Sequence, residues 1–249
     1  MTGGTTKTAL VSGATRGIGL GISTLLARQG YALTLTARDT ERLAAVAAEL
    51  RVSGAADIVT VAADMADGDG IERVLGAHAE RFDTMSALVL NAGVGTAGAL
   101  ADASMRRFDK TLAVNLRAPV LLIQGALPML RAGAAADPGR GAKVIALASM
   151  AGVYAEAGLA VYGAAKAALI SLITTLNAEE SPNGVTATSI APGYVDTEMS
   201  AWIHDRIPPD RMLAVNDVVE MVDALLRLSS RAVVPNIVIS RAGTDGYHA

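Results

Sequence analysis

Cysteine is absent from this chain of 249 residues, and other residues typical of metal and nucleic-acid sites are scarce. Without cysteine there is no disulfide, no thiolate metal ligand and no cysteine nucleophile. The three histidines, His78, His204 and His248, lie far apart without the spacing of metal ligands, so we expect no metal site. Aromatic residues make up 3% of the chain, and 21 Lys and Arg against 24 Asp and Glu give a net charge of −3. A nucleic-acid-binding protein needs a basic field and stacking side chains, so we expect no nucleic-acid partner.

Long apolar runs are also missing. No uninterrupted run approaches the roughly 18 residues of a membrane span, and the first seven residues lack the apolar region of a secretory signal. Nevertheless 51% of the residues are hydrophobic and only 18% are charged, which provides enough apolar surface for a large core. We therefore expect a cytoplasmic protein without a membrane partner, folded as one domain over residues 1–249.

Short β-branched runs alternate along the chain with longer stretches rich in Ala, Leu, Arg and Glu. This alternation requires crossover connections and predicts an α/β fold. We expect a doubly wound Rossmann-type domain, with a seven-stranded, mostly parallel sheet and helices on both faces. The predicted strands cover residues 8–12, 32–37, 57–63, 87–91, 143–149, 185–191 and 237–240, and the predicted helices 17–30, 40–52, 68–80, 104–130, 160–180 and 216–228. Two segments are predicted as surface excursions, 132–141 and 192–215, and residues 194–215 of the second as a substrate lid.

A glycine-rich turn follows the first predicted strand and reads Ser12-Gly13-Ala14-Thr15-Arg16-Gly17-Ile18-Gly19. Its G-x3-G-x-G spacing differs from the common G-x-G-x-x-G dinucleotide pattern, but the same physics applies. Glycines let the backbone approach a pyrophosphate closely, and the following helix offers free N–H groups to the anion. A tight turn without a ligand would explain the glycines equally well if they stood alone. The position after the first strand and the cation at Arg16 favour a dinucleotide site.

The end of the second predicted strand indicates which dinucleotide binds. An acidic residue in this region binds the ribose 2′-hydroxyl of NAD, whereas an arginine accommodates the 2′-phosphate of NADP. Here Ala37 and Arg38 occupy the place of the acid, and Arg38 together with Arg16 can clamp a phosphate. Asp39 comes next, and we interpret it as the cap of the helix that begins near residue 40. The expected cofactor is therefore NADP(H).

Tyr162 and Lys166 stand four residues apart in a predicted helix, so their side chains share one face. An ammonium group close to a phenol favours the phenolate and lowers its pKa from about 10, which suits a general acid or base. Taken alone, such a pair is more often a surface pair without function. Ser149 changes this interpretation, because it ends the fifth predicted strand at the edge where parallel sheets bind ligands.

Together these motifs resemble those of the short-chain dehydrogenase/reductase superfamily, from about residue 7 to residue 243. The resemblance rests on the glycine turn, Asp64-Met65, Asn91-Ala92-Gly93, Asn115, Ser149, Tyr162-x3-Lys166 and Pro192-Gly193, which occur in this order. It implies an enzyme that transfers hydride between NADP(H) and a carbonyl or alcohol, and it suggests members similar to 3-oxoacyl-(acyl-carrier-protein) reductases.

The resemblance also implies a role for each residue. Tyr162 would exchange a proton with the substrate, Ser149 would polarise the carbonyl, and Lys166 would bind the nicotinamide ribose and lower the pKa of the tyrosine. Asn115 would support a water-linked proton relay to Lys166, although taken alone it could be a buried amide satisfied by backbone groups. The residues expected to bind the cofactor are Ser12, Gly13, Thr15, Arg16, Gly17, Ile18, Gly19, Arg38, Asp64, Met65, Asn91, Ala92, Gly93, Tyr162, Lys166, Pro192, Gly193, Val195 and Thr197.

The substrate is indicated by the lid segment. Its apolar residues Val195, Met199, Trp202 and Ile203, with Met199 and Ile203 at the i,i+4 spacing of a helix, predict an apolar wall that suits an acyl-bearing carbonyl. We expect reduction of a 3-oxoacyl thioester, with small ketones, alcohols or 3-hydroxy acids as the alternative. A catalytically idle dinucleotide-sensing module is a further alternative, but it has no need of the four catalytic residues. Apolar residues on several faces of the helices predicted at 104–130 and 160–180 predict a homodimer or homotetramer.

Overall fold

Seven strands form one sheet in the computed structural model, which describes residues 6–247; His248 lies outside this range. The strand order is β3-β2-β1-β4-β5-β6-β7, and every neighbouring pair is parallel. The strands are β1 (Thr8–Ser12), β2 (Ala32–Ala37), β3 (Asp57–Ala62), β4 (Ala87–Leu90), β5 (Ala142–Leu147), β6 (Val185–Pro192) and β7 (Asn236–Ile239). The order reverses between β1 and β4, which is the point where open parallel sheets bind their ligands.

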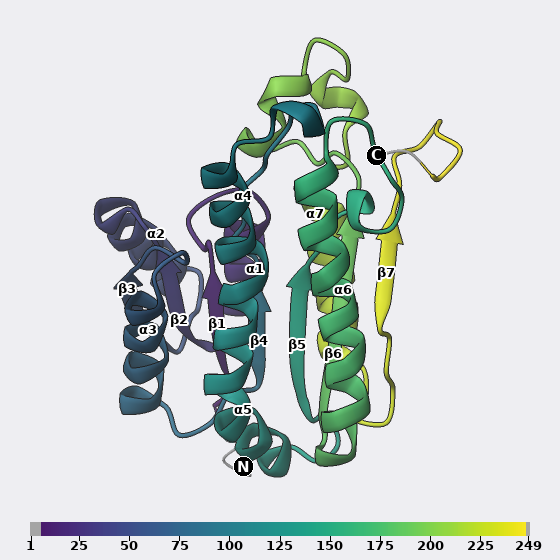
Figure 1. Ribbon diagram of the computed structural model, residues 1–249. Helices are drawn as coiled ribbons and strands as arrows, with labels where there is room; N and C mark the ends of the chain where they lie inside the picture. The colour runs from purple at the N-terminus through teal and green to yellow at the C-terminus, as the bar shows by residue number, and fades with distance from the viewer. Residues whose placement is uncertain (1–5, 248–249) are drawn as a thin grey trace.

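Helices cover both faces of this sheet (Figure 1). One hydrophobic core lies beneath α1 (Gly17–Arg28), α2 (Thr40–Val52) and α7 (Val215–Arg227). The other lies beneath α3 (Gly68–Arg81), α5 (Ala118–Ala136) and α6 (Ala160–Glu180), and α4 (Met105–Leu112) leads into α5. In β1, Ala9 and Val11 belong to the first core and Leu10 to the second, as expected for a strand buried on both faces. The predicted fold class is confirmed.

The helix predicted at 104–130 differs most from the prediction. It is divided into α4, a π-helical turn (Ala113–Arg117) and α5, which continues to Ala136. The first half of the predicted excursion at 132–141 is therefore helical, because alanine propagates a helix better than any other residue. Gly133 is retained there since a Cβ would lie 2.3 Å from the Met85 carbonyl oxygen. The predicted strand at 143–149 ends at Leu147, two residues before Ser149.

Two helical stretches are long and apolar enough to span a membrane by length and composition, Met105–Ala136 and Ala160–Asn183. Both contribute buried side chains to the second core, which is also how the central helices of a parallel sheet behave. Length and hydropathy are therefore weak evidence for a membrane span here.

The segment between β6 and α7 passes over the carboxyl ends of the strands and is light green in Figure 1. It contains two 3-10 helices, η5 (Glu198–Ile203) and η6 (Pro209–Arg211). Its two ends are tied together, because Leu213 N–H donates to Tyr194 O and Asp196 N–H donates to Leu213 O, each at 2.9 Å. The segment is thus a closed loop held at its base.

Candidate active site

A cavity of about 880 Å³ opens at the carboxyl ends of the strands. The glycine turn, the residues after β2, β3 and β4, the start of α6 and the segment after β6 all contribute to its wall. Most of the residues predicted to bind a cofactor line it: Gly13, Thr15, Arg16, Gly17, Ile18, Arg38, Asp64, Met65, Asn91, Ala92, Gly93, Tyr162, Lys166, Pro192, Gly193, Val195 and Thr197. Ser12, Gly19 and Asn115 lie behind the wall rather than in it.

The glycine turn has a conformation that only glycine adopts without strain. Gly13 and Gly17 have φ angles of +67° and +50°. A Cβ at Gly19 would lie 2.2 Å from the Gly13 carbonyl oxygen, so this glycine allows α1 to begin directly behind the turn. The N-cap residue Arg16 makes no side-chain capping hydrogen bond, which leaves the amino end of α1 open towards the cavity. This end therefore has N–H groups that suit an anion.

Ser12 and Asn91 hold the turn against the end of β4. The Ser12 hydroxyl donates to Val89 O at 3.2 Å and accepts from the N–H groups of Asn91 and Ala92 at 3.0 and 3.1 Å. The Asn91 amide donates to the carbonyl oxygens of Ser12 and Gly13, both at 3.0 Å. Ser12 is fully buried, and its hydroxyl bonds to β4 and to the two residues after Leu90.

Three arginines gather at one end of the cavity, where two were predicted. Arg16 and Arg38 both line it, as does Arg42, which was not predicted. Asp39 accepts a hydrogen bond from Arg42 N–H at 3.0 Å and is the N-cap of α2, as predicted. The signal for Arg42 was its spacing, because a residue three positions after an N-cap lies in the first turn of the helix, beside the cap.

Ser149, Tyr162 and Lys166 meet at the other side of the cavity. Ser149 is the N-cap of a short 3-10 helix (Met150–Gly152), whereas Tyr162 and Lys166 lie in the first two turns of α6. The Lys166 ammonium group is buried, lies 5.7 Å from the centre of the Tyr162 ring and donates to Leu147 O at 2.7 Å. The lysine is thereby anchored to the end of β5.

The ionisation of this group differs from the simple prediction. Burial raises the pKa of Tyr162, and a hydrogen bond with Ser149 partly offsets the rise. Burial also lowers the pKa of Lys166 to about 8. The phenol is therefore protonated at neutral pH in this state, and the lysine keeps its charge for the most part. The expected lowering of the tyrosine pKa by Lys166 is not among its causes here.

Two glycines that were not predicted bring Ser149 close to Tyr162. A Cβ at Gly163 would lie 2.5 Å from Ala151 O, and a Cβ at Gly152 would lie 2.7 Å from Lys166 C. The start of α6 and the residues after Ser149 consequently pack backbone against backbone. For Gly163 the signal in the sequence was its place inside a helix otherwise rich in good helix formers. Gly152 lies outside that helix and gave no such signal.

Asn115 lies in the π-helical turn, and π-turns of this kind are frequent at functional sites. Its amide bonds to the backbone of Val94, which follows the Asn91-Ala92-Gly93 motif. A Cβ at Gly93 would lie 3.1 Å from Asn115 Oδ1 and 3.6 Å from Lys166 Nζ. Asn115 therefore stands behind Gly93 on the side of Lys166, although it does not itself line the cavity.

The remaining wall combines apolar side chains with the carboxylates of Glu156 and Glu198. The Tyr194 hydroxyl donates to Glu156 Oε1 at 2.8 Å, and both residues line the cavity. Burial, followed by this contact with Glu156, raises the pKa of Tyr194. Glu156 was not predicted as a site residue.

The prediction that Met199 and Ile203 share the pocket wall is wrong. The segment forms a 3-10 helix, in which residues three apart share a face. Met199 and Trp202 therefore line the cavity, whereas Ile203 is buried beneath the helix.

Comparisons with known proteins identify the family. Residues 7–207 match the family model of the short chain dehydrogenases. The 3-oxoacyl-[acyl-carrier-protein] reductase FabG of Staphylococcus aureus is 32% identical over 204 residues, which are 81% of this chain and 80% of the relative.

Solved structures share the fold over nearly the whole chain. An alcohol dehydrogenase from the archaeon Thermococcus sibiricus, complexed with 5-hydroxy-NADP, has a TM-score of 0.86 at 27% identity and covers 98% of this chain and 99% of its own. An NADH-dependent reductase, A1-R′, has a TM-score of 0.83 at 26% identity, covering 95% and 96%. Other neighbours are complexes with NADP or NADPH. This chain belongs to the short-chain dehydrogenase family.

Proposed function

We propose that this oxidoreductase uses NADP(H) to reduce a carbonyl to an alcohol, and that its substrate is a 3-oxoacyl thioester. The observation that carries the proposal is the presence of two complementary ends in one cavity. Ser149, Tyr162 and Lys166 lie at one side, and the open amino end of α1 lies towards the arginines at the other. The first set suits a carbonyl oxygen, and the second suits the phosphates of a dinucleotide.

The residues at the arginine end fit a cofactor with a 2′-phosphate. Arg38 is exposed on the cavity wall directly after β2, and within residues 6–247 it forms no ion pair. No acidic side chain ends β2, since Asp39 caps α2. A phosphate dianion would gain charge-assisted hydrogen bonds from Arg38 and Arg16. These contacts favour NADP(H) in a family that also includes an NADH-dependent reductase.

The chemistry assigns one task to each side chain. When bound, NADPH would supply the hydride that the carbonyl carbon accepts. The hydroxyls of Ser149 and Tyr162 donate hydrogen bonds to the carbonyl oxygen, and the phenol then gives its proton to the oxygen as the negative charge develops. The phenol of Tyr162 is protonated at neutral pH, which is the form that reduction requires, and its raised pKa makes it a weaker acid than a free phenol. Lys166 keeps a positive charge beside the phenolate that remains.

The cavity wall supports an acyl thioester over a small acid. Met199 and Trp202 offer apolar surface at the entrance, with side chains that are 49% and 55% exposed. Glu156 places a carboxylate in the same wall, which would repel the free carboxylate of a small 3-hydroxy acid. A thioester has no such charge near its reacting carbonyl.

The decisive measurement compares kcat/KM for the reduction of acetoacetyl-coenzyme A and of simple ketones with NADPH. For 3-hydroxy acids, kcat/KM is measured for the reverse reaction, their oxidation with NADP⁺. We expect the thioester to be preferred. A preference for the simple compounds would contradict the acyl assignment and leave the oxidoreductase assignment intact. No turnover on any of them, with NADPH still bound, would favour the idle sensing module.

We also propose that the protein is a homodimer or homotetramer. Leu116, Leu121 and Leu172, in the π-helical turn, α5 and α6, remain partly exposed, although Leu121 and Leu172 also pack against the second core. A two-fold copy would cover these side chains together. Light scattering at micromolar concentration tests this, and a monomeric mass would contradict it.

A further inference from the structure

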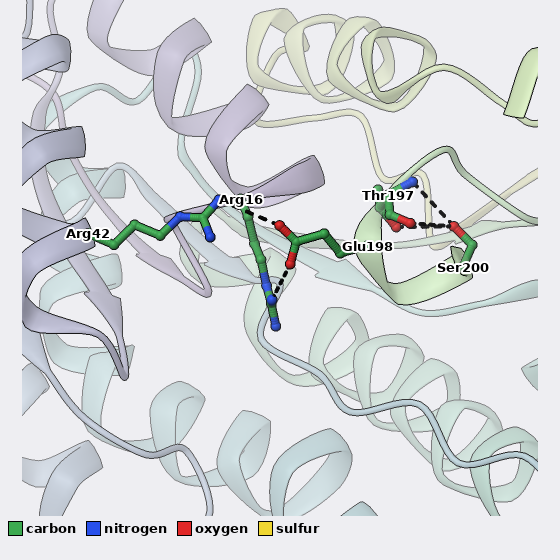
Figure 2. A network of polar contacts seen from close by, with 5 residues as sticks. All are labelled: Arg16, Arg42, Thr197, Glu198 and Ser200. Carbon is green, nitrogen blue, oxygen red and sulfur yellow. Dashed lines mark hydrogen bonds and ion pairs between the residues drawn. The ribbon is translucent and has the colours of Figure 1, made fainter. Parts of the chain in front are cut away.

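The carboxylate of Glu198 lies between two of the three arginines of the cavity (Figure 2). It forms an ion pair with Arg16, and its other oxygen lies 3.6 Å from an Nη atom of Arg42. The two arginines come from the turn after β1 and from the first turn of α2, whereas Glu198 comes from η5. The side chain of Glu198 thus links the turn after β1 and the first turn of α2 to η5. The two arginines mark the nucleotide end of the cavity, and η5 contributes to the wall of its substrate end.

Arg42 occupies an unfavourable position for a cation. It lies in the first turn of α2, where the helix dipole and the free N–H groups favour negative charge. Its backbone is bonded to the Asp39 cap, but its guanidinium group extends to Glu198. A cation at this position does not stabilise α2. The Arg42 guanidinium group at the cavity wall is instead suited to hold an anion.

The backbone of Glu198 is fixed within η5. Glu198 is the first residue of that helix, whose N-cap is Thr197. Thr197 N–H donates to Ser200 Oγ at 3.2 Å, and the hydroxyls of Thr197 and Ser200 lie 3.3 Å apart, as Figure 2 shows. The buried Ser200 fixes this cap, while the same helix carries Met199 and Trp202 on the cavity wall.

From this geometry we infer that Glu198 is a specificity-determining residue for the cofactor, because its carboxylate occupies the place of the cofactor's 2′-phosphate between Arg16 and Arg42. This inference rests on the proposed use of NADP(H). A phosphate carries more charge and one more acceptor oxygen than a carboxylate, so it displaces Glu198 from the arginines. Arg42 is then a third cation for the phosphate, beside Arg16 and Arg38.

Displacement of Glu198 has a second effect at the substrate end. The side chains of Arg16, Glu198 and Arg42 are 54%, 59% and 46% exposed, so the ion pairs are screened by water and a dianion can break them. Once they are broken, η5 loses its ion pairs with the arginines, and Thr197 beside Gly17 remains as its contact with the turn after β1. The 2′-phosphate thereby loosens the helix that carries Met199 and Trp202.

The test uses two cofactor fragments, which separate the 2′-phosphate from the pyrophosphate. Adenosine 2′,5′-bisphosphate has the 2′-phosphate without a pyrophosphate, and adenosine 5′-diphosphate has the reverse. For Glu198→Gln, calorimetry should show about three- to ten-fold tighter binding of the 2′,5′-bisphosphate, the size expected for removing exposed ion-pair competition. The affinity for the 5′-diphosphate should stay within two-fold of the unmodified protein. Asp210→Asn is the matched control, since it removes one negative charge from the exposed η6 of the same segment.

Hydrogen exchange supplies a second measurement that does not depend on turnover. The 2′,5′-bisphosphate should increase exchange at residues 198–203 in the unmodified protein and change it little in Glu198→Gln. Unchanged fragment affinities in Glu198→Gln would overturn the inference, as would tighter binding of the 5′-diphosphate alone, which would place Glu198 against the pyrophosphate. If neither NADPH nor either fragment bound the unmodified protein, the proposed cofactor itself would be wrong.

Discussion

Both polar atoms of the Asn115 side chain bond to the backbone of Val94. Oδ1 accepts from Val94 N–H at 3.0 Å, and Nδ2 donates to Val94 O at 2.9 Å. The amide thus fastens the π-helical turn to the residues that follow β4 and form the middle of the cavity wall. Its contacts are those of a positioning residue, and the proton relay implied by the family resemblance stays a prediction.

Asn115→Asp should separate these roles. The change keeps the shape and the acceptor but places a carboxylate oxygen against Val94 O, so a buried hydrogen bond is lost at a cost of about 1–3 kcal/mol in the free energy of unfolding. Since the wall at Val94 shifts with it, KM for the cofactor should rise together with the fall in stability. Urea unfolding and steady-state kinetics measure both. An unchanged KM with a large loss of kcat would instead support a direct part in proton transfer.

Tyr162→Phe should reduce kcat by about 10²–10⁴-fold, because only the proton donor is removed. NADPH affinity, measured by fluorescence titration, should remain within about two-fold. Tyr154→Phe is the matched control, because Tyr154 packs edge-to-face on Tyr247 at 5.2 Å instead of lining the cavity. Substantial activity in Tyr162→Phe would show that another group gives the proton.

Arg38→Asp should reverse the cofactor preference. The carboxylate would repel the 2′-phosphate and accept hydrogen bonds from the ribose hydroxyls of NADH. A charge-assisted hydrogen bond is worth about 1.5–3 kcal/mol, so kcat/KM for NADPH should fall at least ten-fold. Arg73→Asp, at an exposed position of α3 away from the cavity, controls for net charge. Equal use of both cofactors by the unmodified protein would refute the role assigned to Arg38.

The pH dependence of stability should contain a contribution from His78. This fully buried ring bonds to Thr34 Oγ1 at 2.8 Å and to Thr84 O at 3.1 Å, and burial lowers its pKa below 6.5. Above pH 6.5 the imidazole of His78 is neutral in both the folded and the unfolded protein. Below pH 6.5 it binds a proton in the unfolded protein first, because its pKa is lower in the folded protein. Stability should therefore fall on acidification, by up to about 1.4 kcal/mol per pH unit from this group. His78→Gln cannot titrate, and urea unfolding at pH 7.5 and 5.5 should show a smaller decrease for it. An identical decrease in both proteins would remove His78 as a cause.

Gly133→Ala and Gly76→Ala should have opposite effects although both glycines are helical. A Cβ at Gly133 would lie 2.3 Å from Met85 O, whereas Gly76 in α3 has open space around it. Overpacking should cost about 1–3 kcal/mol at Gly133, and better helix propensity should contribute about 0.5–1 kcal/mol at Gly76. Thermal unfolding of the two variants provides the comparison, and a stabilised Gly133→Ala would contradict the close packing of α5 on the loop before β4.

The sequence predicted every strand to within two residues at each end, because doubly covered strands are apolar runs separated by long helices. The division of the helix at 104–130 was not predicted. A π-helical turn leaves the hydrophobic pattern of the helix almost continuous, so the sequence does not indicate it. In the structure the turn places the Asn115 amide against the backbone of Val94. Likewise the i,i+4 spacing of Met199 and Ile203 suggested an α-helix. The six residues Glu198–Ile203, which lie between Pro192-Gly193 and Pro208-Pro209, instead form the tighter 3-10 helix.

The candidate site was predictable where one residue type implies one chemistry and less so where two segments meet. The roles of Tyr162, Lys166 and Arg38 could be predicted from their residue types and their positions in the sequence. Arg42 and Glu198 acquire theirs only when α2 and η5, which are far apart in the chain, lie across the same cavity.

The central position of the first strand affects the chain while it is still being synthesised. β1 can pair with β2 as soon as Ala37 has left the ribosome, but its partner on the other side, β4, ends only at Leu90. Until then the N–H and C=O groups along that edge of β1 have no strand to bond, and an open apolar edge is a template for a second nascent chain. The half-built sheet therefore presents this edge until β4 has been synthesised.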